Sequence, residues 1–138
     1  MIVLDTSGLL AAIDDSQRHH EAARQTLESD EGPFLLSPFV LAELDYLLAT
    51  RVSLQAELSL LAQVAEGAYR LEPFVSEDVE QAAELIERYR DLKIGLADAS
   101  IAVIAARAKT TRILTLDERH FRTIRPLHGG TFQLLPKD

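Results

Sequence analysis

Apolar residues along this chain fall into short runs separated by longer segments of mixed polarity. The runs are IVL within the predicted strand at 2–5, FLL at 34–36, RILTL at 112–116 and TFQLL at 131–135, with YRLEPF at 69–74 as a further candidate. Short runs of this kind between turn-forming residues are typical of buried strands. We therefore expect short strands at these places.

Amphipathic or alanine-rich segments lie between the strands, and we expect helices in them. They are residues 7–14, residues 17–29, two segments that begin after Ser37 and Ser53, residues 76–90 and residues 96–108. Ser16, Ser37 and Ser53 are placed to cap helix starts, and Pro38 takes a first helical position. The last segment is apolar on nearly every side, which predicts that it is buried.

Strands that alternate with helices favour an α/β fold with a parallel sheet covered on both faces. Apolar residues of the helices near 39–65, such as Leu54, Leu58 and Leu61, are expected to pack mostly into the core. A dimer or partner surface is the alternative use for them. In parallel α/β folds, ligands collect at the carboxyl ends of the strands, so residues that follow strands are the first candidates for a site.

Two acidic residues follow predicted strands. Asp5 ends the first strand, and Asp117 comes directly after RILTL. Because the carboxyl ends of parallel strands lie at one edge of the sheet, we expect the two carboxylates near each other. Helix capping is the alternative use of Asp5, since aspartate caps helix starts well.

Two further acids lie near helix starts on faces that are otherwise apolar. Glu43 falls within or beside a stripe that includes Val40 and Leu47, and Asp98 precedes Ile101 at helical spacing. A carboxylate on a buried face is costly unless it is paired or bound to a metal. A structural ion pair for Glu43, and a favourable interaction with the helix dipole for Asp98, are the alternatives.

Four carboxylates at one edge of a sheet would repel one another unless divalent cations lie among them. Carboxylate oxygens favour Mg²⁺ or Mn²⁺, and such ions support phosphodiester hydrolysis by activating water. Thr6, Ser7 and Thr115 place hydroxyl groups at the same edge. The chain has no glycine-rich phosphate loop, and the spacing of its four histidines fits no zinc pattern.

The composition is that of an ordinary globular domain, with 138 residues, 47% of them hydrophobic. The absence of cysteine excludes disulfides and thiolate zinc sites. No apolar run is long enough for a signal peptide or a membrane span. We therefore expect a single domain over residues 1–138, in the cytoplasm and without a membrane partner.

The net charge of −8 argues at first against a nucleic-acid partner. The charge is unevenly distributed, however, because residues 105–138 hold seven Lys and Arg against three acids. Arg119, Arg122 and Arg125 in this basic part are candidates for phosphate contacts, which would make binding sensitive to salt. Scattered solvated charge is the alternative interpretation.

Four segments, taken in order, resemble the PIN-domain ribonucleases, and most closely the VapC toxins of bacterial VapBC toxin–antitoxin pairs. They are VLDTSGLLA around Asp5, LAEL around Glu43, GLADASIAVIAAR around Asp98 and ILTLDERHF around Asp117. Each segment alone is weakly specific, but the ordered set extends from Met1 to about Phe121.

The resemblance implies a three-layer α/β/α fold and Mg²⁺- or Mn²⁺-dependent endonucleolytic cleavage of RNA, often tRNA or ribosomal RNA. It also implies a homodimer that a VapB-type antitoxin inhibits. Asp5, Glu43, Asp98 and Asp117 match the acidic catalytic and metal-binding set of the family. Thr6 and Thr115 match small hydroxyl positions beside the metal, with Ser7 as a helper.

One position departs from a common family pattern, because His120 stands where many members carry another acid. The histidine could contact a phosphate, pair with Asp117 or pack beside Phe121, and the sequence leaves these roles open. Two other functions also remain open. One is a non-catalytic PIN module that binds basic side chains of a protein partner, and the other is a housekeeping metal-dependent nuclease.

Overall fold

A computed structural model describes all residues from 1 to 138, and its centre is a five-stranded sheet in which every pair of neighbours is parallel. The strand order is β3–β2–β1–β4–β5. The strands are β1 (Ile2–Leu4), β2 (Phe34–Leu36), β3 (Arg70–Leu71), β4 (Arg112–Leu114) and β5 (Gln133–Leu135). The predicted parallel sheet is confirmed.

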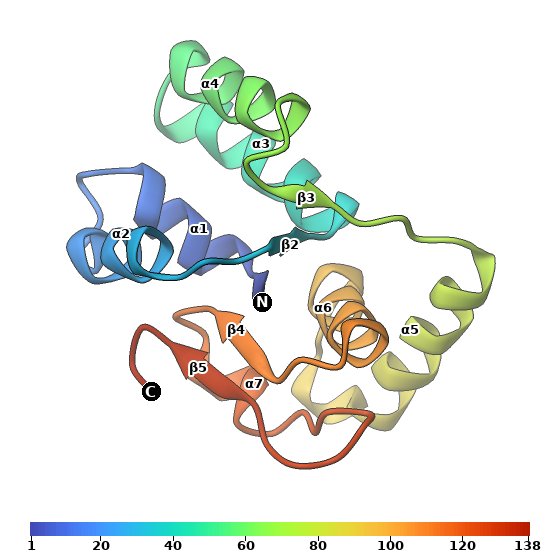
Figure 1. Cartoon of the computed structure of the whole chain (residues 1–138). Helices are drawn as coiled ribbons and strands as arrows, with labels where there is room; N and C mark the ends of the chain where they lie inside the picture. Colours follow the sequence, from blue (N-terminus) through green and yellow to red (C-terminus); the bar gives the residue numbers. More distant parts are fainter.

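Seven α-helices connect and cover the strands. They are α1 (Thr6–Ile13), α2 (His20–Ser29), α3 (Pro38–Arg51), α4 (Leu54–Ala65), α5 (Ser76–Arg88), α6 (Leu96–Ala108) and α7 (Glu118–Phe121), with a short 3₁₀ helix at Arg90–Leu92. α1 and α2 lie on one side of the sheet and α5 and α6 on the other, while α3 and α4 pack together near β3 (Figure 1). This is the predicted α/β/α arrangement. No helix has the length and apolar content that crossing a bilayer requires.

The last residues of the three central strands lie side by side. Leu4 pairs in register with Leu36 on one side and with Leu114 on the other, and all three are fully buried. The residues that follow, Asp5, Ser37 and Thr115, therefore leave the sheet at the same level. This register brings segments more than 100 residues apart in sequence together at one edge.

Several helix starts are as predicted. The Ser37 hydroxyl accepts a hydrogen bond from the backbone N–H of Phe39, and the Ser53 hydroxyl accepts one from Ala56. The expected cap at Ser16 is wrong, because its hydroxyl donates to Asp14 and α2 begins only at His20. Asp14 instead accepts the Ser16 hydroxyl and backbone N–H in a local side-chain turn before the helix.

α6 is buried as expected, since every residue from Ala99 to Ala105 is inaccessible to solvent or nearly so. The apolar face of α4 differs from the prediction of core packing. Leu54, Leu58 and Leu61 are exposed, and Leu60 is the residue of this helix that enters the core. The α3–α4 pair thus presents apolar side chains to solvent.

Candidate metal centre

The four predicted acids lie at one cavity of about 410 Å³ on the carboxyl edge of the sheet. Its lining consists of Asp5, Thr6, Ser7, Leu10, Glu43, Leu47, Gly95, Leu96, Ala97, Asp98 and Asp117. Four separate elements contribute to it: the β1–α1 junction, α3, the start of α6 and the segment after β4. The convergence predicted from the sequence is thus present in the fold.

Asp5 is buried at the floor of the site and is held by two hydroxyl groups. Its Oδ2 accepts hydrogen bonds from Thr115 Oγ1 at 2.7 Å and from Ser7 Oγ at 3.0 Å. Burial, together with the nearby negative charge of Asp98, raises the pKa of Asp5 to about 6, although the two hydroxyl groups act in the opposite direction. Asp5 is also the residue before α1, but its side chain makes no cap hydrogen bond.

The same two hydroxyls hold the segment after β4 against β1. Ser7 Oγ accepts from the backbone N–H of Leu116 at 2.9 Å, and Thr115 Oγ1 accepts from that of Asp117 at 2.9 Å. Both hydroxyls therefore donate to Asp5 and accept from the backbone of the segment that carries Asp117. Ser7 and Thr115 act on the arrangement of the carboxylates as well as on the charge of Asp5.

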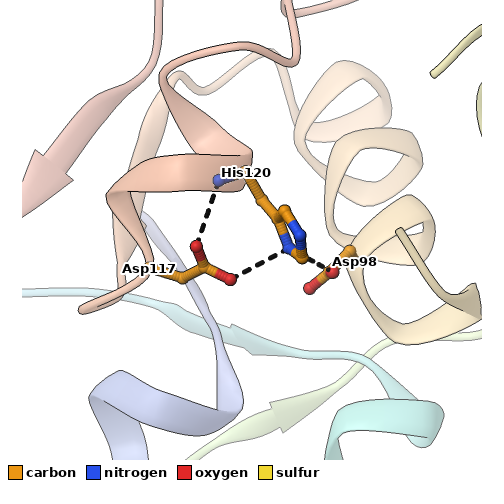
Figure 2. Close-up of side chains that lie close together, drawn as sticks. All are labelled: Asp98, Asp117 and His120. Atoms are coloured by element: carbon orange, nitrogen blue, oxygen red, sulfur yellow. Dashed lines mark hydrogen bonds and ion pairs between the residues drawn. The ribbon is translucent and has the colours of Figure 1, made fainter. Parts of the chain in front are cut away.

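Asp98 and Asp117 face each other across the ring of His120 (Figure 2). His120 Nδ1 lies 2.9 Å from Asp98 Oδ2 and 2.9 Å from Asp117 Oδ2. The other carboxylate oxygen of Asp117 accepts the backbone N–H of His120 and so caps α7. Of the three roles left open for His120, pairing with Asp117 is present, and Asp98 is a second partner that the sequence did not indicate.

The pKa of Asp98 is raised above its ordinary value. Burial is the main cause, and the negative charges of Asp117 and Glu43 add to it while His120 opposes it. Glu43 is exposed at the cavity wall and not buried in the apolar stripe of α3. No ion pair of Glu43 is present, so its carboxylate remains available to a ligand.

A pair of buried hydroxyls fixes the start of α3 relative to the start of α6. Ser37 Oγ and Ser100 Oγ are 2.7 Å apart, and both residues are fully buried. The bond joins the helix that carries Glu43 to the helix that carries Asp98. Sequence reasoning assigned Ser37 only to capping and did not single out Ser100, which looks like any small residue of an alanine-rich helix.

The donor set fits a divalent cation. Four carboxylates face one small cavity, and the pKa values of two of them, Asp5 and Asp98, are raised mainly by burial and further by the neighbouring negative charges. Thr6 also lines the cavity and is 5% exposed, and its hydroxyl has no hydrogen-bond partner. A bound hydrated ion would compensate the charges of these carboxylates.

The three candidate phosphate-binding arginines differ in their surroundings. Arg122 makes two hydrogen bonds to the carboxylate of Asp138, at 2.7 and 2.6 Å. The side chains of Arg119 and Arg125 are exposed and make no ion pair. Arg119 and Arg125 are thus the members of the set with free guanidinium groups.

The sequence matches the model of the PIN-domain family over residues 2–125. It is 44% identical, over 135 residues, to the ribonuclease VapC26 of Mycobacterium tuberculosis, an alignment that covers 98% of this chain and 100% of that relative. This chain belongs to the VapC ribonucleases of the PIN-domain family. The resemblance predicted from the four sequence segments is therefore confirmed.

Solved VapC structures share the fold. The toxin VapC20 of M. tuberculosis, described as cleaving the sarcin–ricin loop, superposes with a TM-score of 0.77 at 24% identity, covering 85% of this chain and 90% of that one. VapBC2 of Rickettsia felis, bound to a DNA fragment from its promoter, gives a TM-score of 0.69 at 22% identity over 97% of this chain and 98% of that one. At this identity the likeness shows the PIN fold.

Proposed function

We propose that this VapC-family chain is the toxin of a type II toxin–antitoxin pair, a cytoplasmic endoribonuclease that depends on Mg²⁺ or Mn²⁺. The observation that carries the proposal is the convergence of four carboxylates from four elements on one cavity. The 44% identity to a ribonuclease over nearly the whole chain supports the reaction class. tRNA and ribosomal RNA are the substrates we expect.

Asp5, Asp98 and Asp117 would hold the principal ion, directly or through water, and Glu43 would hold a second ion or orient the attacking water. When bound, such an ion supplies an activated water and stabilises negative charge on the phosphodiester. Ser7 and Thr115 keep Asp5 and the Asp117 segment in place through their hydrogen bonds. Thr6 lies beside them in the lining of the cavity, with a buried hydroxyl that has no hydrogen-bond partner.

The RNA backbone would approach the cavity along the basic C-terminal part of the chain. Arg119 and Arg125 have free guanidinium groups for phosphates, whereas Arg122 would have to leave Asp138 first. The acidic cavity itself repels a polyanion until cations occupy it. Divalent ions would therefore be required both for binding the substrate and for cleaving it.

A VapB-type antitoxin and a second copy of the chain are the protein partners we expect. Exposed apolar residues on the α3–α4 pair support a protein-binding surface, because large apolar side chains at the surface are typical of interfaces. They are Tyr46, Val52, Leu54, Leu58 and Leu61. The relatives with this fold include toxin–antitoxin complexes, which is consistent with a partner of this kind.

The test is RNA cleavage by the purified chain, free of antitoxin, on total RNA with Mg²⁺ or Mn²⁺. We expect discrete cuts that EDTA abolishes and that Asp98→Asn and Glu43→Gln reduce by at least two orders of magnitude. Asp15→Asn, which removes an exposed acid far from the cavity lining, is the matched control and should cleave normally.

Full activity in EDTA, or in both acid variants, would refute the metal mechanism. A folded protein that binds Mn²⁺ but cuts no RNA from a broad panel would favour the protein-binding module instead. A small neighbouring reading frame for a DNA-binding antitoxin would distinguish a toxin from a housekeeping nuclease.

A further inference from the structure

His120 lies between the carboxylates of Asp98 and Asp117. Its Nδ1 is inaccessible to solvent and makes no well-aligned hydrogen bond, although it lies 2.9 Å from an oxygen of Asp98 and 2.9 Å from an oxygen of Asp117. A buried nitrogen that is close to two acceptors without being aligned to either is not explained by hydrogen bonding alone.

The spacing of these three atoms is that of neighbouring ligands around one ion. Adjacent ligands of an octahedral ion with bonds of about 2.1 Å lie about 3 Å apart. One donor atom from each of Asp98, Asp117 and His120 can be chosen so that all three lie within 4.8 Å of one another. The three side chains converge on the same space from α6 and from the α7 segment (Figure 2).

A second observation, which does not depend on the acids, supports a bound ligand at this site. Thr6, which is 5% exposed, lines the cavity that Asp98 and Asp117 also line, and its buried hydroxyl has no hydrogen-bond partner. The cavity of about 410 Å³ has room for a hydrated ion.

We propose that Nδ1 of His120 is a ligand of the cation held by Asp98 and Asp117, and that this nitrogen makes the site select Mn²⁺ over Mg²⁺. Mg²⁺ takes oxygen ligands and keeps much of its water, whereas imidazole nitrogen suits transition metals. A mixed site of two carboxylates and one imidazole therefore discriminates between the two ions in a way that four carboxylates do not. The inference rests on the proposed metal-dependent nuclease and names its ion.

The test is pulsed EPR on the full chain, purified without a histidine tag and loaded with one equivalent of Mn²⁺. We expect electron spin echo modulation from a directly bound ¹⁴N nucleus, and its loss in His120→Asp. His128→Asn, which changes an exposed histidine, is the matched control and should keep the modulation.

Titration calorimetry of Mn²⁺ and Mg²⁺ supplies a second readout. The preference of the unmodified protein for Mn²⁺ should fall by about tenfold or more in His120→Asp, because that change makes the donor set all oxygen. Bound Mn²⁺ without nitrogen modulation would overturn the inference and leave His120 as a group that orients the carboxylates. Cleavage of RNA would then continue to support the nuclease, whereas a chain that binds neither ion and cuts no RNA would overturn both.

Discussion

Asp5→Asn should stabilise the metal-free protein while abolishing its activity. The pKa of Asp5 is raised from 3.8 to about 6 in the folded chain, chiefly by burial. Each unit of difference from the unfolded chain corresponds to about 1.4 kcal/mol, so the ionised form costs roughly 3 kcal/mol of folding free energy. Asparagine has no charge to desolvate, and its side-chain oxygen can still accept from Ser7 and Thr115.

The sign of the pH dependence follows from the raised pKa. A carboxyl group whose pKa is higher in the folded chain contributes its full stability below pH 4, where it is protonated in both states. That stability is lost as the pH rises through about 6. The variant should therefore match the unmodified protein near pH 4 and exceed it at pH 8, by roughly 1–3 kcal/mol once imperfect replacement of the hydrogen bonds is allowed for.

The assay is thermal unfolding in EDTA across pH 4 to 8. For a chain of this size 1 kcal/mol corresponds to a shift in Tm of roughly 3–4 °C, so a gain of about 3–12 °C is expected at pH 8. Asp15→Asn removes the same charge from an exposed position and controls for the general effect of lowering the net charge of −8. Added Mn²⁺ should raise the Tm of the unmodified protein and leave that of the variant nearly unchanged. A variant that is less stable at pH 8, or whose gain is equally large at pH 4, would refute the reasoning.

Three further predictions test the hydrogen bond from Thr115 to Asp5, the contact of Arg119 with RNA and the packing of Gly8. Thr115→Val should cost about 1–3 kcal/mol in chemical unfolding, because the charge of Asp5 loses its closest donor, and Thr115→Ser should restore most of the loss. Arg119→Gln should weaken RNA binding and lower the slope of log affinity against log salt concentration by about one. The measurement is fluorescence anisotropy in a catalytically inactive variant. An unchanged slope would show that Arg119 does not contact the RNA. Gly8→Ala should destabilise the fold strongly, since a Cβ there would lie 2.4 Å from the backbone oxygen of Leu114, and a Tm within a degree of the unmodified protein would contradict that contact.

The sheet and the acidic edge could be predicted because local patterns determine both. Short apolar runs indicated the strands, and parallel pairing then requires that their carboxyl ends share one edge. Asp5 and Asp117 follow two of these strands, so their proximity needed only the topology. The sequence predicts that Glu43 lies near the cavity but not that its side chain is exposed, because that exposure depends on how α3 packs against its neighbours.

The parts that were missed depend on contacts between distant segments. Nothing local distinguishes Ser100 from the small residues around it until Ser37 lies 2.7 Å away. The one-turn helix α7 is too short to show a period in the sequence, so the contact of His120 with Asp98 could not be foreseen. The apolar face of α4 shows the periodicity of a core helix, and only the fold shows that most of it remains outside.

The register that aligns Leu4 with Leu114 also determines when the site can exist. Asp5, Glu43 and Asp98 are synthesised first, but the second strand that pairs with β1 and the second hydroxyl that donates to Asp5 come only with Ile113 and Thr115. A chain whose synthesis stops after α6 contains three of the four acids and has no complete cavity. We therefore expect a nascent chain to have no nuclease activity until the residues through Thr115 are available for folding.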